Sequence, residues 1–112
     1  MELKYPIFIL SKDDLTIRMI NSPKELDWYE EIDIKEGLYN GWDINGYPIE
    51  LYMDGKKVAL KFTSLQSSPT ELKEAILNYA RIMKPNSPFI NSAQNTDVLG
   101  LFKAVEKHVN IR

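Results

Sequence analysis

The chain has 112 residues, of which 44% are hydrophobic and 27% charged, with a formal net charge of −2 and no cysteine. This size and composition predict one domain over residues 1–112 that buries its core without disulfides. The missing cysteine excludes thiolate chemistry, and no apolar run approaches the ~20 residues that a membrane-spanning helix needs. We therefore expect a cytoplasmic protein that does not enter a membrane.

The charges are divided unequally between the two halves of the chain. Residues 1–54 carry five Lys/Arg and 12 Asp/Glu, whereas residues 55–112 carry nine Lys/Arg and four Asp/Glu. The acidic total argues against a nucleic-acid-binding protein, which needs a basic field. The asymmetry indicates either a charge dipole or two surfaces whose charges simply keep them in water.

The first predicted element is a β-hairpin. Residues 5–10 are apolar throughout and residues 15–20 alternate, a pattern typical of two neighbouring strands. A four-residue loop over 11–14 would place Leu10 opposite Leu15 and Phe8 opposite Ile17. The core face would then carry Phe8, Leu10, Leu15, Ile17 and Met19, and the other face Tyr5, Ile7, Ile9, Thr16 and Arg18.

A helix is predicted to begin after Ser22. Pro23 suits the first helical position, and Glu25 can return a hydrogen bond to the cap, so the pattern is that of a capping box. The helix should run to about residue 32, with Leu26, Tyr29 and Ile32 buried and Trp28 at the margin. Its outer side would be strongly acidic, through Asp27, Glu30, Glu31, Asp33 and Glu36.

Residues 36–63 predict three consecutive antiparallel strands. Asn45-Gly46 and Asp54-Gly55 are preferred sequences for two-residue type I′ turns. With those turns, Trp42, Ile49 and Leu60 would lie side by side on a core face that also carries Asn40. A slip of one residue would turn the apolar set outward. The opposite face would carry Tyr39, Gly41, Asp43, Pro48, Glu50, Tyr52, Lys57, Ala59 and Lys61.

Two helices are predicted in the C-terminal part. Ser68-Pro69-Thr70-Glu71 repeats the capping box, and the helix after it should end before Pro85. After a loop, Asn95 or Thr96 would cap a last helix that ends near residue 110. The apolar stripes are Leu72, Ala75, Ile76, Tyr79 and Met83 in the first helix, and Leu99, Phe102, Val105 and Val109 in the second.

The order ββα-βββ-αα predicts an α+β fold, with an antiparallel sheet of about five strands and helices packed mainly on one face. No catalytic motif accompanies it. His108 is the only histidine, so the spacing of a two-histidine metal site is absent, and the glycines stand singly rather than in a phosphate-binding loop. Asp43 and Glu50 share a predicted sheet face, as solvated acids often do. We predict a protein that is not an enzyme and that holds no cofactor or metal.

Two surfaces are predicted to contact a protein partner, which is either another protein or a second copy of the chain. The first is the outer sheet face with Tyr39, Tyr52 and Lys57, unless residues 84–96 or the last helix cover it. The second is the acidic helix, where an exposed aromatic side chain accompanies several acids. By analogy of charge, it would attract a basic protein as acidic inhibitors of nucleases and toxins do. Its contact residues are Trp28, Glu30 and Glu31.

The competing hypothesis is a small-molecule-binding protein or an enzyme, with a pocket between the sheet and the helices. Trp42, Tyr47 and Tyr79 would line this pocket, and Asn40 would supply its polar group. An open pocket with an unpaired Asn40 would favour the ligand hypothesis. A filled interior with an exposed tyrosine patch would favour the protein-contact hypothesis.

Overall fold

The computed structural model describes residues 2–83 and 97–110, and it confirms the predicted α+β fold. The antiparallel sheet has five strands in the order β2-β1-β3-β4-β5. The strands are β1 (Ile7–Ser11), β2 (Ile17–Ile20), β3 (Tyr39–Trp42), β4 (Pro48–Asp54) and β5 (Lys57–Phe62). The helical elements are the 3₁₀ helix η1 (Pro23–Trp28), α1 (Glu31–Lys35), α2 (Pro69–Met83) and α4 (Val98–Asn110).

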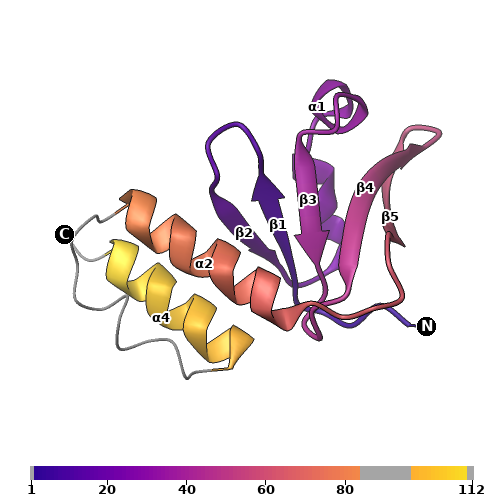
Figure 1. The fold of residues 1–112 in the computed structure, drawn as a ribbon. Coiled ribbons are helices and arrows are strands. Elements are labelled where there is room, and N and C mark those ends of the chain that lie inside the picture. Colours follow the sequence, from indigo (N-terminus) through magenta and orange to yellow (C-terminus); the bar gives the residue numbers. More distant parts are fainter. Residues whose placement is uncertain (1, 84–96, 111–112) are drawn as a thin grey trace.

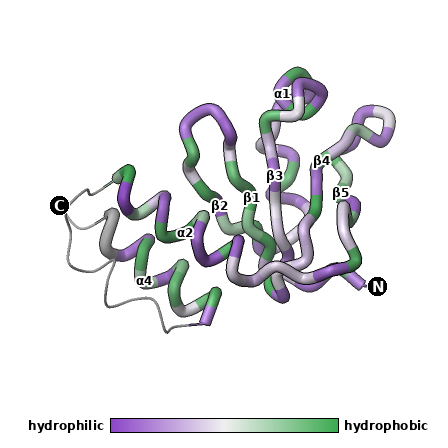
Figure 2. Tube along the Cα trace, viewed as in Figure 1, coloured by the Kyte–Doolittle hydropathy of each residue, from purple (hydrophilic) through white to green (hydrophobic). Residues whose placement is uncertain are grey.

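The two long helices, α2 and α4, lie side by side against the β2-β1-β3 half of the sheet (Figure 1). Phe8 from β1 meets Phe102 from α4 edge to face, with ring centroids 5.2 Å apart. Apolar residues recur along β1 and β2 and in stripes along both helices (Figure 2). Eleven buried side chains form this first core: Phe8, Ile17, Trp42, Leu72, Ile76, Leu77, Ala80, Val98, Leu101, Phe102 and Val105.

The predicted stripes of the long helices are largely confirmed. The exceptions are Met83, which is 48% exposed at the end of α2, and Leu99, which is half-buried while Val98 and Leu101 are buried in the first core. Asp97 caps α4, because its Oδ1 accepts the Gly100 N–H at 2.7 Å. The predicted caps Asn95 and Thr96 and the side chain of Val109 lie outside the described residues. Among residues 2–83 and 97–110, no helix combines the length and the apolarity needed to cross a bilayer.

A second core fills the opposite face of the sheet, under η1 and α1. Leu26, Tyr29 and Ile34 pack there against strands β1 and β4, and η1 touches both edge strands, β2 and β5. Ile7 and Ile9, which we expected on an uncovered face, are 0% and 2% exposed for this reason. The helical segments η1 and α1 cover that face, whereas α4 packs on the other face, and residues 84–96 lie outside the described residues.

The first hairpin keeps its predicted faces but not its predicted partners. Leu10 pairs with Ile17 and Phe8 with Met19, two residues away from the expected register. Leu15 is not in the strand: it has φ +61 and is 39% exposed. The loop closes one residue later than expected because the Ser11 N–H donates to the Thr16 carbonyl at 2.9 Å.

The pairing of β3 with β4 differs from the predicted pairing by one residue. Trp42 pairs with Pro48 and Gly41 with Ile49. The Gly46 N–H donates to the Asp43 carbonyl at 2.9 Å and Gly46 has φ +84, as expected of a three-residue loop built on a type I turn with a bulge. The slip places Trp42 in the first core and Ile49 in the second, so the prediction that they share a face is wrong.

The pairing of β4 with β5 differs from the predicted pairing by two residues. A shift by an even number leaves each side chain on its predicted face of the sheet. Asp54 pairs with Lys57 and Met53 with Val58, so Gly55 and Lys56 are the central residues. Gly55 has φ +63, which suits the first central position of a type II′ turn. Leu51, Met53, Val58 and Leu60 share one face as predicted, although each has a different partner.

Candidate binding surface

The predicted tyrosine patch is not formed. The one-residue slip places Tyr39 in the second core, where its ring lies 4.7 Å from that of Tyr29. Tyr52 points to the other side of the sheet, is 38% exposed and lies under the ammonium group of Lys61 at 5.3 Å. Lys57 shares the face of Tyr52. The outer sheet face that we expected therefore does not exist as one surface.

The predicted ligand pocket is not formed either. Asn40 is exposed and lines, with Trp42, a shallow groove of about 210 Å³. The ring of Tyr47 packs on Phe62 at 6.1 Å, and Tyr79 lines a different cavity. The four residues therefore do not line one pocket.

The two candidate acids, Asp43 and Glu50, lie in different environments. Glu50 forms an ion pair with Lys61 at 3.0 Å, while Asp43 is fully buried in the turn after β3. Within the described residues, no three acidic, cysteine or histidine side chains come together as metal ligands would. The side chain of His108 lies outside the described part of the chain.

The segment from Pro23 to Glu36 folds as its sequence indicates at the start and departs from the prediction in the middle. The Glu25 carboxylate accepts the N–H of Ser22 at 2.9 Å, which is the capping-box contact. The backbone of Tyr29 is extended, with φ −84 and ψ 137, so the helix breaks there and α1 starts in a new direction. Ile34 is therefore buried in place of Ile32.

This break leaves two large apolar side chains in water. Trp28 is 65% exposed and Ile32 is 62% exposed. The acids around them are also exposed, and only Glu31 forms an ion pair among the described residues, with Lys35 at 3.2 Å. We define the acidic surface as six exposed residues of the segment 27–36: Asp27, Trp28, Glu30, Glu31, Ile32 and Glu36. Two lysines, Lys24 and Lys35, are also exposed in η1 and α1.

Sequence reasoning identified the acids and Trp28 but missed Ile32. Two signals were available. Trp28 and Tyr29 are adjacent, so one helix face cannot bury both, and Ile32 and Ile34 are two apart, so they cannot face the same side of a helix. Burial of Tyr29 and Ile34 leaves their neighbours exposed.

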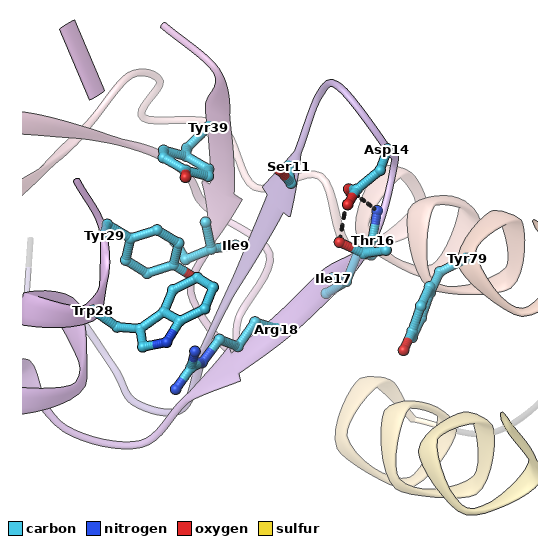
Figure 3. A pocket seen from close by; sticks show the side chains of 10 residues that line it. All are labelled: Ile9, Ser11, Asp14, Thr16, Ile17, Arg18, Trp28, Tyr29, Tyr39 and Tyr79. Atoms are coloured by element: carbon cyan, nitrogen blue, oxygen red, sulfur yellow. Dashed lines mark hydrogen bonds between the residues drawn. The ribbon is translucent and has the colours of Figure 1, made fainter. Parts of the chain in front are cut away.

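The ring of Trp28 packs against Tyr29, whose ring packs in turn against Tyr39. The Trp28 ring meets Tyr29 edge to face at 5.4 Å, and the guanidinium of Arg18 lies 4.4 Å from the Trp28 centroid (Figure 3). Burial raises the pKa of Tyr29 to about 12. Burial also raises the pKa of Tyr39, as does the nearby Asp33 carboxylate, whose Oδ2 accepts the Tyr39 hydroxyl at 3.5 Å. Both tyrosines are therefore neutral at physiological pH.

A cavity of about 310 Å³ lies beside these rings. Figure 3 shows Trp28, Tyr29 and Tyr39 on one side of β2 and Tyr79 on the other. The Asp14 carboxylate accepts the Thr16 hydroxyl at 2.8 Å, and this bond lowers the pKa of Asp14. The lining residues are Ile9, Ser11, Asp14, Thr16, Ile17, Arg18, Trp28, Tyr29, Tyr39 and Tyr79.

Comparisons of the chain with protein-family models, with curated proteins and with solved structures find no match.

Proposed function

We propose that this protein is a non-enzymatic binding module whose acidic surface attaches to a basic surface of a partner protein. The observation that supports the proposal is the exposure of Trp28 and Ile32, at 65% and 62%, among acids that mostly lack a cation within the described residues. Scattered exposed hydrophobic side chains are ordinary, but here a tryptophan and an isoleucine lie four residues apart in one short acidic segment.

The parts of the acidic surface have complementary physical roles in binding. Tryptophan is enriched among the residues that dominate binding energy because it buries a large area with few rotatable bonds. Arg18 and Tyr29 already hold the Trp28 ring, so less side-chain freedom is lost on association. The acids raise the rate of encounter with a basic partner and repel an acidic one.

The proposal includes inhibition of a basic nuclease or toxin as one instance. Self-association through this surface is disfavoured because two copies would bring acid against acid. The alternative function, a small-molecule-binding protein or an enzyme, lacks the support of its expected pocket because Asn40, Trp42, Tyr47 and Tyr79 do not converge.

Site-specific photocrosslinking tests the proposal. The photoreactive residue p-benzoylphenylalanine is placed at position 28 of the full chain, expressed in its own host, and at position 65 as the control. Leu65 is the matched control because it is 83% exposed and lies between β5 and α2, outside the acidic surface. We expect a covalent adduct from position 28 that position 65 does not give, with a partner whose cross-linked surface is basic.

Charge reversal then tests the role of the acids on the purified pair. Asp27→Lys/Glu30→Lys should weaken binding at least about tenfold and reduce its dependence on salt, since rim and central charges act through long-range attraction. The control, Glu71→Lys/Glu74→Lys, reverses two exposed charges on α2 and should change affinity by less than about twofold. Equal adducts from positions 28 and 65, or equal effects of the two reversals, would overturn the proposal.

A further inference from the structure

Strand β2 forms one edge of the sheet, and part of its backbone points away from the molecule. In an antiparallel pair, residues exchange hydrogen bonds with the partner strand at every second position. The Ser11 N–H donates to the Thr16 carbonyl at 2.9 Å, and the register pairs Ile9 with Arg18. Arg18 therefore bonds to β1, while the N–H and C=O groups of Ile17 and Met19 point outward.

No described residue receives these outward groups. Among residues 2–83 and 97–110, no hydrogen bond joins the backbone of Ile17 or Met19 to a residue outside the β1–β2 pair. A strand with free N–H and C=O groups is a template for a further strand. An extended segment laid along β2 would satisfy them.

The cavity of about 310 Å³ supplies room for the side chains of such a segment. Its lining includes Arg18 and Trp28 from one side of β2, and Ile17 and Tyr79 from the other (Figure 3). β1 pairs with the inner edge of β2, so a space that touches both sides passes the outer edge of β2 or the loop end that carries Asp14 and Thr16. Successive side chains of a strand point to opposite faces, so an added strand would fill both parts.

The charges on this edge indicate which residue would lie at the centre of the added segment. Arg18 has no carboxylate within ion-pair distance among the described residues. A residue directly opposite Arg18 on an added antiparallel strand would share its face and lie beside its guanidinium, where an acid is favoured. Its two neighbours would point toward Ile17, Met19 and Tyr79, where apolar side chains fit.

We propose that the outer edge of β2 binds an extended peptide segment by strand addition, with an acidic residue opposite Arg18 and an apolar residue on each side of it. The proposal does not depend on the acidic surface having a basic partner. It commits to a peptide rather than to a second copy of the chain. Symmetric pairing of Ile17 with Met19 of another copy would place Arg18 opposite Arg18, and like charges in that position repel.

The other edge of the sheet, β5, is protected by comparison. Lys56, Lys57 and Lys61 lie in its turn and along it, and exposed lysines are a common device that prevents strand addition. β5 therefore serves as the internal control.

Titration of the ¹⁵N-labelled full chain with the peptide acetyl-KTTLELTTK-amide tests the proposal by NMR. The amide signals of Ile17 and Met19 and the indole signal of Trp28 should shift together, while those of Val58 and Leu60 on β5 stay in place. Peptides with one N-methylated residue separate strand addition from loose association. Methylation of either leucine removes a pairing N–H and should weaken binding at least about tenfold, whereas methylation of the glutamate, whose N–H points outward, should change it by less than about twofold.

A charge swap tests the position opposite Arg18. Replacing the peptide glutamate by lysine should weaken binding at least about threefold, and Arg18→Glu should reverse that preference. Arg81→Glu, which changes an exposed arginine on α2, should leave the preference unaltered. Circular dichroism and the unfolding midpoint establish that each variant is folded.

Three outcomes would overturn the inference: equal binding of the leucine-methylated peptides, shifts that map to β5, or self-association through β2 without peptide. Asp27→Lys/Glu30→Lys should leave peptide binding within about twofold. The inference and the proposed function can therefore fail separately.

Discussion

Asp43 is joined twice to Tyr47 across the turn that follows β3. Its Oδ1 accepts the Tyr47 N–H at 3.0 Å, and its own N–H donates to the Tyr47 carbonyl at 3.1 Å. The same Oδ1 accepts the Asn45 N–H at 3.0 Å, and the residue is fully buried. A buried carboxylate thus holds together the loop that sets the register of β3 against β4.

Removal of this carboxylate should destabilise the protein strongly. Asp43→Ala leaves two backbone N–H groups without their acceptor and should lower the free energy of unfolding by about 2–4 kcal/mol. Asp43→Asn keeps an oxygen acceptor and should cost less. Urea denaturation of the variants gives the values. Asp54→Ala in the exposed turn before β5 is the control, at about 0.5 kcal/mol or less; equal losses at positions 43 and 54 would contradict the role of Asp43.

Gly46 should tolerate a side chain less well than Gly55. Both have positive φ, +84 and +63, but a Cβ at position 46 would lie 2.6 Å from the Pro69 nitrogen, whereas one at position 55 meets nothing within 4 Å. Gly55→Ala therefore reports the backbone strain alone, about 1 kcal/mol. Gly46→Ala adds a clash with the backbone at the start of α2 and should cost at least about 1 kcal/mol more. Thermal unfolding of the two variants should show the larger decrease in Tm for position 46.

Stability should fall as the pH rises from 10 to about 12, because burial raises the pKa of Tyr29 from its ordinary value of 10.0 to about 12. Across that range the unfolded chain loses a proton that the folded chain retains, so deprotonation favours unfolding. The contribution is fully present below pH 10.

Tyr29→Phe should reduce the slope of stability against pH. Burial also raises the pKa of Tyr5, Tyr39 and Tyr79, so part of the slope should remain. Ultraviolet titration of the wild type and the variant checks the assignment. If the variant retains every tyrosine that titrates late in the wild type, the assignment to Tyr29 is wrong.

The two tryptophans should differ in their access to a quencher. Trp28 is 65% exposed and Trp42 is 8% exposed. In Trp42→Phe, which retains Trp28, acrylamide should quench the fluorescence efficiently, and in Trp28→Phe it should quench poorly. Iodide should also quench Trp28, although the acids around it will weaken the effect at low salt. Similar acrylamide quenching in both variants would exclude the described position of Trp28.

Much of the fold follows from local sequence. The capping residues before Pro23 and Pro69 are correct starts of helical segments, and the alternation of Phe8 and Leu10 with Ile17 and Met19 correctly predicts their shared face. These features depend on residues close together in the chain, where backbone geometry and side-chain period leave few choices. They are sufficient for the element order and for the α+β class.

The register at Asn45-Gly46 and the cover of the second sheet face were decided by tertiary structure. The Asn-Gly pair fits either a two-residue turn or a three-residue turn with a bulge, and the two differ by one residue in pairing. Burial of the Asp43 carboxylate and the seating of Gly46 against Pro69 select the second turn. The Asp43 hydrogen bonds join residues of one turn, but the contact between Gly46 and Pro69 joins segments that are far apart in the chain, which no local pattern determines. Because strand side chains alternate, that single residue moved Trp42 and Ile49 into different cores, and it separated Tyr39 from Tyr52.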